Sequence, residues 1–405
     1  MKRILYITDF PPSKDYTGGL VIDRLCRLLP PESVFCFSII NPLFAQNAST
    51  DLPITIHFAE KPTEEGIRPY PGWLGAAKCF ADQTYTKFVS CSKIVDEAEA
   101  FARENNVDAI FSIVEGQTVV RVTLELARRT KLPLYTMVWD SLDWWLRSYK
   151  VDALTRKWAQ WDFDRLMRMS RACATASWAM SEQYEKLYGI RCTPVISSLP
   201  GGMARSPAQR PRTDEIWIGL AGQLYAIDEW TRLVTALNDV NWIIDGKTVR
   251  LKLIGLKESP IEGTNLEFLG YHPQEKVIEL LSEMDICLCP YPFAAEMKDV
   301  ASTSFPSKLT SYLAAGRPTL LHGPAYASPA RYVREHKVGL VADREDARHL
   351  IETIARLVGD ANEYATMSAN AHQAFLRDFT LEQMRSNFLN VLEIEQTAEK
   401  QSVPI

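Results

Sequence analysis

Several features that define specialised protein classes are missing from this sequence. The eight cysteines form no C-x-x-C pair and show no metal-finger spacing, so nothing indicates a disulfide framework or a structural zinc site. No apolar run approaches the ~20 residues of a membrane-spanning helix, and the run after Lys2 and Arg3 is too short for the core of a secretory signal. Low-complexity segments are also absent. These absences predict a folded protein with reduced thiols in the cytoplasm.

An excess of positive charge is missing too. The formal net charge is −5 and the isoelectric point is about 5.8, whereas a general nucleic-acid binder carries a basic field. We therefore expect no nucleic-acid partner. The composition, with 46% apolar and 23% charged residues, is that of a folded soluble protein. A length of 405 residues suits two domains of about 200 residues each, because a single core rarely grows that large.

Short apolar, β-prone runs recur along the chain, and helical patterns separate most of them. In the first half they span residues 4–8, 34–40, 54–58, 108–114, 132–138, 172–176 and 193–198. In the second half they span 216–221, 249–254, 266–271, 286–290, 318–322 and 338–341. This alternation predicts two doubly wound, mainly parallel α/β sheets. The segment 201–211 is rich in Gly, Pro and Arg and is the predicted linker, which places the domains at 1–205 and 206–380.

The most informative stretch, residues 303–318, reads T-S-F-P-S-K-L-T-S-Y-L-A-A-G-R-P. It follows the apolar run 286–290 and a predicted loop over 291–304. Pro306 suits a first helical turn and Gly316 suits a left-handed C-cap, so we expect a short helix between them.

The start of this predicted helix suits an anion. Helix N-termini at the carboxyl ends of parallel strands point amide groups outward, and ligands of open α/β sheets bind there. Ser304 and Ser307 would add hydroxyls and Lys308 a positive charge, which together suit a diphosphate. An ordinary crossover helix whose lysine faces water is the alternative.

Polar and aromatic residues also follow predicted strands of the first half. Gly18 and Gly19 come after the first strand and before an apolar helix predicted over 20–29, where a glycine pair lets a ligand approach the backbone. A tight turn is the alternative. The pattern G-x-G-x-x-G is absent, which disfavours a dinucleotide site of the dehydrogenase type.

The segment W-D-S-L-D-W-W, residues 139–145, follows the fifth predicted strand. Aromatic faces stack on sugar rings while carboxylates accept hydroxyl hydrogens, so Trp139, Asp143 and Trp144 are candidate acceptor-binding residues. Interdomain packing of the indoles is the alternative. Asp140 and Glu115 are candidate catalytic carboxylates at strand ends, although a general base would need a partner or burial to tune it.

The order F-P-S-K-L-x-x-Y-L-A-A-G-R-P, residues 305–318, resembles the donor-site helix of GT-B glycosyltransferases, in particular the retaining, nucleotide-sugar-dependent enzymes of glycosyltransferase family 4. The resemblance implies an α/β protein with the GT-B architecture, in which two Rossmann-like domains face a central cleft. It also implies that a last helix, within 381–405, packs back on the N-terminal domain. A plain terminal helix of the second domain is the alternative.

The resemblance further implies a transferase of the hexosyltransferase type, active in polysaccharide biosynthesis. Such an enzyme moves a sugar from a nucleotide-diphosphate sugar to a hydroxyl of a glycan, a glycolipid or a small molecule. It retains the anomeric configuration and uses neither a metal nor another cofactor. The departing phosphate oxygen is thought to take the acceptor proton in such enzymes, so Lys308 would act catalytically by stabilising the leaving diphosphate.

The resemblance also assigns the donor-binding residues. They are Gly18, Gly19, Gly222, Gln223, His272, Thr303, Ser304, Phe305, Ser307, Lys308 and Ser311. A surface-turn histidine is the alternative for His272.

The chain departs from the family pattern at the donor site. The family usually has an arginine where this chain has Gln223, a lysine where it has Asp228, and paired glutamates where it has Thr303 and Ser311. The cationic clamp would therefore shrink to Lys308 and backbone amides. Either the nucleotide is gripped differently, as would suit a thymidine-type donor that lacks the ribose 2′-hydroxyl, or catalysis has been lost.

A basic, aromatic helix is predicted over 154–171. Such a helix suits an anionic lipid surface, where a lipid-linked acceptor would be met at the inner face of the membrane. A solvated face with a buried aromatic stripe explains the pattern equally well. The expected partners are thus a nucleotide-sugar donor and a glycan or lipid-linked acceptor, with peripheral membrane association left open.

The alternatives to an active transferase are an inactive module, an epimerase and a phosphorylase. A catalytically inactive GT-B module that binds a nucleotide sugar or a partner enzyme would explain the replaced glutamates. A GT-B epimerase would release free nucleoside diphosphate without an acceptor. A phosphorylase would need a lysine placed for pyridoxal phosphate, and the sequence shows no sign of one.

Overall fold

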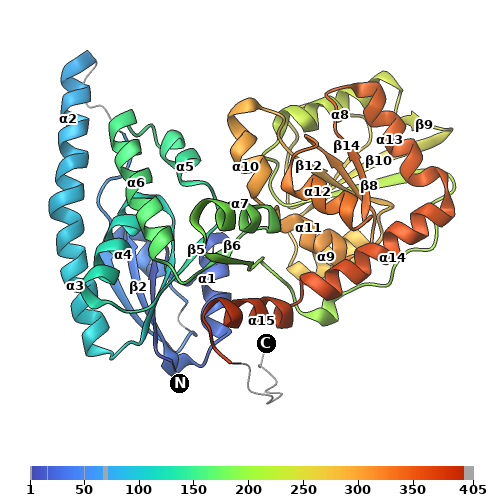
Figure 1. Ribbon diagram of the computed structural model, residues 1–405. Helices are drawn as coiled ribbons and strands as arrows, with labels where there is room; N and C mark the ends of the chain where they lie inside the picture. Colours follow the sequence, from blue (N-terminus) through green and yellow to red (C-terminus); the bar gives the residue numbers. More distant parts are fainter. Residues whose placement is uncertain (1, 16, 50, 67–71, 396–405) are drawn as a thin grey trace. The chain divides into compact units, whose positions relative to one another are not determined.

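The computed structural model describes residues 2–395 except 16, 50 and 67–71. It divides into two compact units, each with its own sheet. The first unit comprises Met1–Val195 and Arg385–Ile405, and the second comprises Ile196–Met384. Apart from the last segment, Figure 1 draws the first unit in blue to green and the second in yellow-green to orange-red. The division falls before the predicted linker at 201–211, of which Gly201–Met203 forms a short 3-10 turn.

The sheet of the first unit is entirely parallel, with the order β3-β2-β1-β4-β5-β6-β7. Its strands are β1 (Ile4–Thr8), β2 (Val34–Ile40), β3 (Thr55–Glu60), β4 (Ala109–Ile113), β5 (Leu134–Val138), β6 (Ala172–Thr175) and β7 (Arg191–Pro194). Six of them lie where the sequence predicts. The predicted run 193–198 is wrong in its bounds, because β7 begins at Arg191 and its pairing with β6 ends where Thr175 pairs with Pro194.

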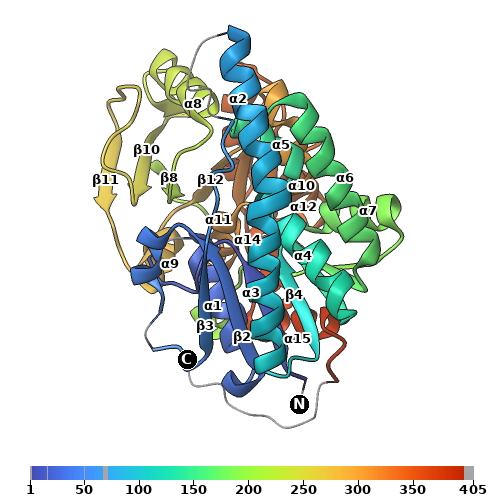
Figure 2. The ribbon, with the colours of Figure 1, turned by 90° about the vertical axis from the view of Figure 1, so that its left-hand side faces the viewer.

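Helices cover both faces of this sheet. They are α1 (Thr17–Arg27), α2 (Gly72–Tyr85), α3 (Cys91–Glu104), α4 (Gly116–Thr130), α5 (Leu142–Ser148), α6 (Ala153–Met169) and α7 (Trp178–Tyr188). A π-helical turn (η3, Thr86–Ser90) joins α2 to α3, so the two helices form one rod along a side of the unit (Figures 1 and 2).

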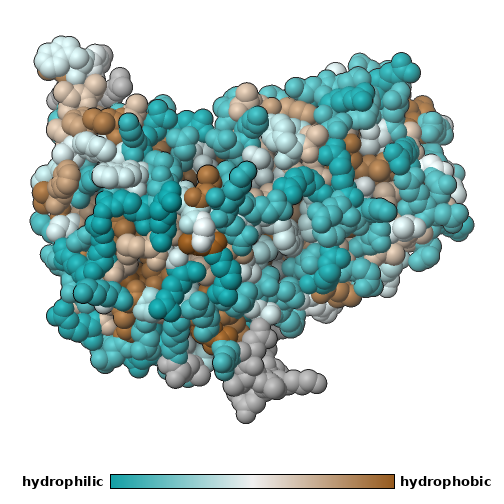
Figure 3. All heavy atoms as spheres, viewed as in Figure 1, coloured by the Kyte–Doolittle hydropathy of each residue, from teal (hydrophilic) through white to brown (hydrophobic). Residues whose placement is uncertain are grey.

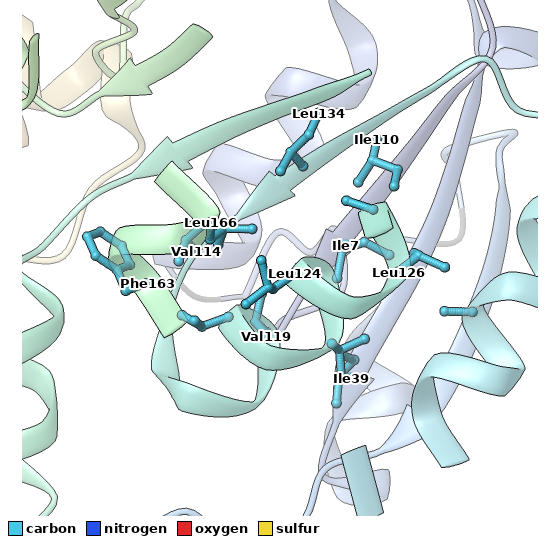
Figure 4. Close-up of a cluster of buried hydrophobic side chains, with 14 of the residues drawn as sticks. Ile7, Ile39, Ile110, Val114, Val119, Leu124, Leu126, Leu134, Phe163 and Leu166 are labelled. Carbon is cyan, nitrogen blue, oxygen red and sulfur yellow. The ribbon is translucent and has the colours of Figure 1, made fainter. Parts of the chain in front are cut away.

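The core of the first unit lies between the sheet and α4. Branched aliphatic side chains from three neighbouring strands, including Ile7, Ile110 and Leu134, meet Val119 and Leu124 of α4 (Figure 4). All are almost fully buried. Strands buried on both faces explain why the sequence shows continuous apolar runs rather than alternation.

The last helix, α15 (Leu381–Val391), contributes to this core from Arg385 onward. Phe388 packs edge-on against Phe111, with ring centroids 5.0 Å apart, and against Tyr6 at 6.4 Å. Asn387 donates a hydrogen bond to the carbonyl of Pro194. The aromatic contacts hold this part of α15 against the first sheet.

The sheet of the second unit has the order β11-β10-β8-β12-β13-β14, all parallel, with the short β9 pairing antiparallel to β10. Its strands are β8 (Glu215–Ala221), β9 (Ile243–Ile244), β10 (Lys247–Ile254), β11 (Leu266–Gly270), β12 (Ile286–Pro290), β13 (Thr319–His322) and β14 (Gly339–Ala342). The prediction missed β9, because two residues carry no periodic signal.

The helices of the second unit are α8 (Ile227–Asp239), α9 (Gln274–Ser282), α10 (Lys298–Thr303), α11 (Ser307–Ala314), α12 (Ser328–Glu335), α13 (Ala347–Gly359) and α14 (Ala361–Asp378). The predicted loop over 291–304 is wrong in part, since it contains α10 and a 3-10 turn, Ala295–Met297. The short helix between Pro306 and Gly316 is confirmed, with Gly316 at a φ of 63° after its end.

The described helices include none with the length and hydropathy that crossing a membrane requires. All eight cysteines, which lie in the described part of the chain, are buried as free thiols.

Candidate functional site

The start of α11 lies at the carboxyl edge of the second sheet. β8, β12 and β13 are neighbours, so residues that follow these parallel strands gather at one edge. The Nζ atom of Lys308, on the first turn of α11, donates a hydrogen bond to the carbonyl of Gln223, which follows β8, at 2.9 Å. It also lies 5.0 Å from the ring centroid of Tyr225. Burial lowers the pKa of Lys308.

The predicted residues Gly222 and Gln223 form the turn after β8. Gly222 has a φ of 79°, a conformation that other residues adopt at a cost, and its N–H donates to the carbonyl of Ile254 at 3.0 Å. Both residues are exposed. The structure therefore brings together Gln223 and Lys308, two residues of the predicted donor site.

Ser307 is exposed on the first turn of α11, where the Leu309 amide already donates to the carbonyl of Pro306 at 3.0 Å and the earlier amides precede the first i to i−4 hydrogen bond of the helix. Ser304 ends α10, and its carbonyl accepts a hydrogen bond from the Tyr291 hydroxyl at 3.2 Å. Phe305 stacks on Phe379 with centroids 5.6 Å apart, so its side chain packs inside the second unit. Its role is one of support for the helix start.

The two positions where the family pattern has glutamates are both buried. The Thr303 hydroxyl donates to the carbonyl of Asp299 at 2.7 Å within α10. The Ser311 hydroxyl accepts a hydrogen bond at 2.9 Å from the side-chain amide of Gln274, on the first turn of α9. Sequence reasoning missed Gln274, although it lies only two residues after the predicted site residue His272.

His272 is half-buried, and its Nε2 hydrogen-bonds the carbonyl of Leu269 at 2.7 Å. This contact closes the turn after β11. The ring therefore holds its own turn in this structure, and only Nδ1 remains for another partner.

In the first unit, three carboxylates follow three neighbouring strands. Asp9 comes directly after β1, Glu115 shortly after β4 and Asp140 shortly after β5. Burial, then Asp9 and Asp140, raises the pKa of Glu115 to about 8. Burial raises the pKa of Asp9 to about 6. The ammonium group of Lys61 opposes this rise, and the carboxylate of Glu64 adds to it. Buried carboxylates with raised pKa values at a strand edge mark a candidate functional site.

Lys61, just after β3, connects this group. Its Nζ lies 3.3 Å from an oxygen of Asp9 and 3.0 Å from an oxygen of Glu64. Burial alone would lower the pKa of Lys61, but these two carboxylates raise it above its usual range. Sequence reasoning missed all three residues. Asp9 was findable, because it directly follows a predicted strand as Glu115 and Asp140 do.

The glycine pair belongs to the helix rather than to a preceding loop. Gly18 and Gly19 lie in the first turn of α1, which begins at Thr17 and not at residue 20. A Cβ atom on Gly18 would lie 3.3 Å from Phe10 and 3.6 Å from Trp139. Gly18 therefore lets α1 approach the turn after β5.

The other predicted acceptor residues belong to α5, which sequence reasoning did not separate from the preceding turn. Asp143 forms an ion pair with Arg147 at 3.1 Å, one turn along the helix. Trp144 is half-buried and packs against the core of the first unit, so part of its surface is unavailable to a ligand. Trp139 is half-buried in the turn before α5.

Within the described residues, no group of three or more His, Cys, Asp or Glu side chains is arranged to hold a metal ion. A cavity of about 860 Å³ opens beside β14, lined by Arg334, His349 and Arg356 among others. Its lining includes none of the predicted site residues.

Comparisons with known proteins agree with this layout. Residues 216–360, from β8 to the end of α13, match the family model described as glycosyl transferases group 1. HepE of Anabaena in complex with UDP is 13% identical with a TM-score of 0.66, over 96% of this chain and 99% of that chain. Comparison with curated protein sequences finds no significant match.

Two further solved structures share the architecture. Sucrose-phosphate synthase from Thermosynechococcus elongatus is 13% identical with a TM-score of 0.65, over 97% of this chain and 98% of that chain. The α,α-trehalose 6-phosphate synthase from Burkholderia multivorans is 11% identical with a TM-score of 0.63, over 97% and 98%. The chain thus has the GT-B fold that its sequence predicts, and residues 216–360 of its second unit match the family model of glycosyl transferases group 1.

Proposed function

We propose that this protein is an active glycosyltransferase that moves a sugar from a nucleotide-diphosphate sugar to a hydroxyl acceptor. The observation that carries the proposal is the position of Lys308. Its ammonium group lies on the first turn of α11 at the carboxyl edge of the second sheet, next to the backbone of Gln223. A cation and outward-pointing amides at one helix start suit a diphosphate.

The ammonium group of Lys308 and the backbone amides of Ser307 and Lys308 stabilise the charge that develops on the leaving diphosphate. This electrostatic task needs no metal, so the proposed reaction is metal-independent. We place the acceptor at the carboxyl edge of the first sheet, near Asp140 and Glu115. With its pKa raised to about 8, Glu115 holds a proton at neutral pH and can donate a hydrogen bond to an acceptor oxygen. Retention of configuration follows from the family resemblance.

UDP is the first nucleotide to test, because the HepE structures contain UDP, UDP and glucose, or UDP-glucose. The experiment is a thermal-shift and transfer panel with UDP-, GDP- and dTDP-sugars on the wild type, Lys308→Ala and Lys276→Ala. Lys276 is an exposed lysine of the same unit and serves as the matched control. We expect a shift with at least one nucleotide sugar, lost only in Lys308→Ala. A flat response to all three in the wild type contradicts the proposal.

An inactive nucleotide-sugar-binding module remains the alternative, since Thr303 and Ser311 replace the two glutamates. It predicts a thermal shift without donor hydrolysis or transfer to any acceptor. A nucleotide-sugar epimerase predicts release of free nucleoside diphosphate when no acceptor is present. The same panel therefore separates the three functions.

A lipid-linked acceptor is supported by the aromatic and basic residues of α6 and the adjoining rod. Trp73, Phe88 and Trp161 are 77%, 64% and 60% exposed. The guanidinium of Arg165 lies 5.1 Å from the ring centroid of Trp161, which pairs a positive charge with an exposed indole. Brown and pale atoms lie among teal ones along this rod in Figure 3. Co-sedimentation with vesicles containing anionic lipid, with Trp161→Glu as the variant, tests the association.

A further inference from the structure

The ammonium group of the half-buried Lys308 contacts a carbonyl and an aromatic ring. In the part of the chain that the structure describes, no carboxylate pairs with its ammonium group. Its contacts are instead the carbonyl of Gln223 at 2.9 Å and the ring of Tyr225, with 5.0 Å from Nζ to the centroid. Neither contact carries a formal negative charge. The positive charge of Lys308 is therefore oriented without being neutralised.

A second tyrosine ring packs against the ring of Tyr225. The ring of Tyr225 meets that of Tyr291 edge-to-face, with centroids 6.0 Å apart and planes at 84°. Tyr291 is 3% exposed, and its hydroxyl donates to the carbonyl of Ser304. Ala226, which follows Tyr225 in the sequence, is buried and anchors the turn before α8. A chain of contacts thus runs from the end of α10 through two aromatic rings to Lys308.

The energetic consequence follows from the chemistry of the contacts. Burial of an ammonium group favours its neutral form, and this lowers the pKa of Lys308. The face of an aromatic ring attracts a cation, and the carbonyl dipole does the same. A carboxylate would hold the ammonium more firmly, but it would repel a phosphate and compete with it. An aromatic face holds the cation while leaving its charge available to an anion.

We propose that Tyr225 is a positioning residue for the donor diphosphate, acting through Lys308. Its ring face holds the ammonium group at the start of α11 in the position that a diphosphate needs. This inference rests on the proposed function, since it concerns the same donor site.

The aromatic face, and not the hydroxyl, is the feature that matters. Tyr225→Ala and Tyr225→Leu remove the face, while Tyr225→Phe keeps it. We expect UDP affinity to fall by about five- to twentyfold in the Ala and Leu variants, the range that a cation–π contact supports, and the Phe variant to recover most of this loss. Tyr225 is 47% exposed, so these variants should fold, and their melting temperatures check this.

A double-mutant cycle with Lys308→Met separates positioning from a direct role of Tyr225. If Tyr225 acts through Lys308, Tyr225→Ala has no further effect on UDP affinity in the Lys308→Met background. The same variants are titrated with uridine, which carries no phosphate. Uridine affinity should not change in Tyr225→Ala. Additive losses in the cycle, or an equal loss for uridine, would show that Tyr225 contacts the nucleoside and would overturn the inference.

The second unit offers a matched control. The ammonium of Lys298 lies 5.6 Å from the ring centroid of Tyr326, another lysine on a tyrosine face. Tyr326→Ala removes a comparable contact and should leave UDP affinity within twofold of the wild type. An equal loss in Tyr326→Ala would mean that the effect of Tyr225→Ala is not specific to Lys308.

The two proposals fail in different ways. If the wild type binds none of UDP, GDP and dTDP, the proposed function is wrong and the role of Tyr225 falls with it. If the wild type binds a nucleoside diphosphate but Tyr225→Ala binds it as tightly, only the inference about Tyr225 is wrong. In a transfer assay, a positioning role predicts a raised KM for the donor together with a reduced kcat, because Lys308 would serve both binding and leaving-group stabilisation.

Discussion

An oxygen of the Glu64 side chain accepts a hydrogen bond from the backbone N–H of Thr118 at 2.6 Å. Thr118 lies in the first turn of α4, so a residue far away in sequence caps this helix. Glu115 occupies the N-cap position itself but makes no capping bond. The carboxylate of Glu115 therefore does not cap α4 and remains available for the chemistry proposed above.

Removal of the Glu64 carboxylate should destabilise the first unit. Glu64→Ala loses the cap on α4 and also a partner of Lys61, whose ammonium would stay half-buried. We expect a loss of about 2–4 kcal/mol in the free energy of unfolding. Urea denaturation measures it, with Glu65→Ala as the control because Glu65 is exposed. A Glu64→Ala protein as stable as the control variant would contradict the capping role.

Gly116 should tolerate no side chain. It has a φ of 75°, and a Cβ atom would lie 2.7 Å from Oε2 of Glu64. Gly189 has a φ of 66° with nothing within 4 Å of its Cβ position, so it isolates the backbone cost. We expect Gly189→Ala to cost about 1 kcal/mol and Gly116→Ala roughly 2 kcal/mol more. Equal costs in urea denaturation would show that Glu64 moves aside freely.

Most of the fold could be predicted from the sequence because buried parallel strands appear in it as continuous apolar runs. Runs such as 34–40 and 286–290 are short, continuous and apolar, and each became a strand with those bounds. Elements without such periodicity were missed. The two residues of β9 are too few for a pattern, and α10 has no apolar stripe that separates it from a loop.

The candidate site could be predicted only in part, because some of its contacts join residues that are far apart in the sequence. The motif around Lys308 has a local order of residues, whereas the contacts of Glu64 and Tyr225 depend on which loops the sheet order brings together. The pairing of Lys61 with Asp9 requires that β3 and β1 lie two positions apart in the sheet. Strand order is a tertiary property, and single-sequence patterns do not carry it.

Stability should depend on pH through Glu115. Its folded-state pKa is raised to about 8 by burial and the nearby carboxylates, so the folded protein keeps a proton that the unfolded chain has lost. The stability from this group is fully present below the unfolded pKa of about 4.5 and is lost as the pH rises toward 8. Glu115→Gln should match the wild type near pH 4 and exceed it by on the order of 2 kcal/mol above pH 8.

Thermal unfolding across that pH range measures the effect of Glu115→Gln. Glu104→Gln is the control, because Glu104 is exposed on the last turn of α3. A difference between Glu115→Gln and the wild type that stays constant with pH would mean that Glu115 ionises normally in the folded protein.

The last prediction concerns the sugar of the nucleotide. In the family pattern the position of Ser311 holds both ribose hydroxyls through a carboxylate, whereas here the serine hydroxyl is buried and accepts a hydrogen bond from Gln274. A site without that carboxylate loses its main means of sensing a 2′-hydroxyl. We therefore expect the wild type to bind UDP and dUDP, which differ only in that group, within about threefold of each other. Ser311→Glu should restore a preference for UDP of about tenfold, since a hydrogen bond to a charged group contributes ~1.5–3 kcal/mol.

Calorimetric titration with both nucleotides checks this preference. Ser302→Glu is the control, because the Ser302 hydroxyl donates to carbonyls within α10. A tenfold preference for UDP in the wild type would mean that another side chain already grips the ribose, and the 2′-hydroxyl contact would then have to be sought outside α11.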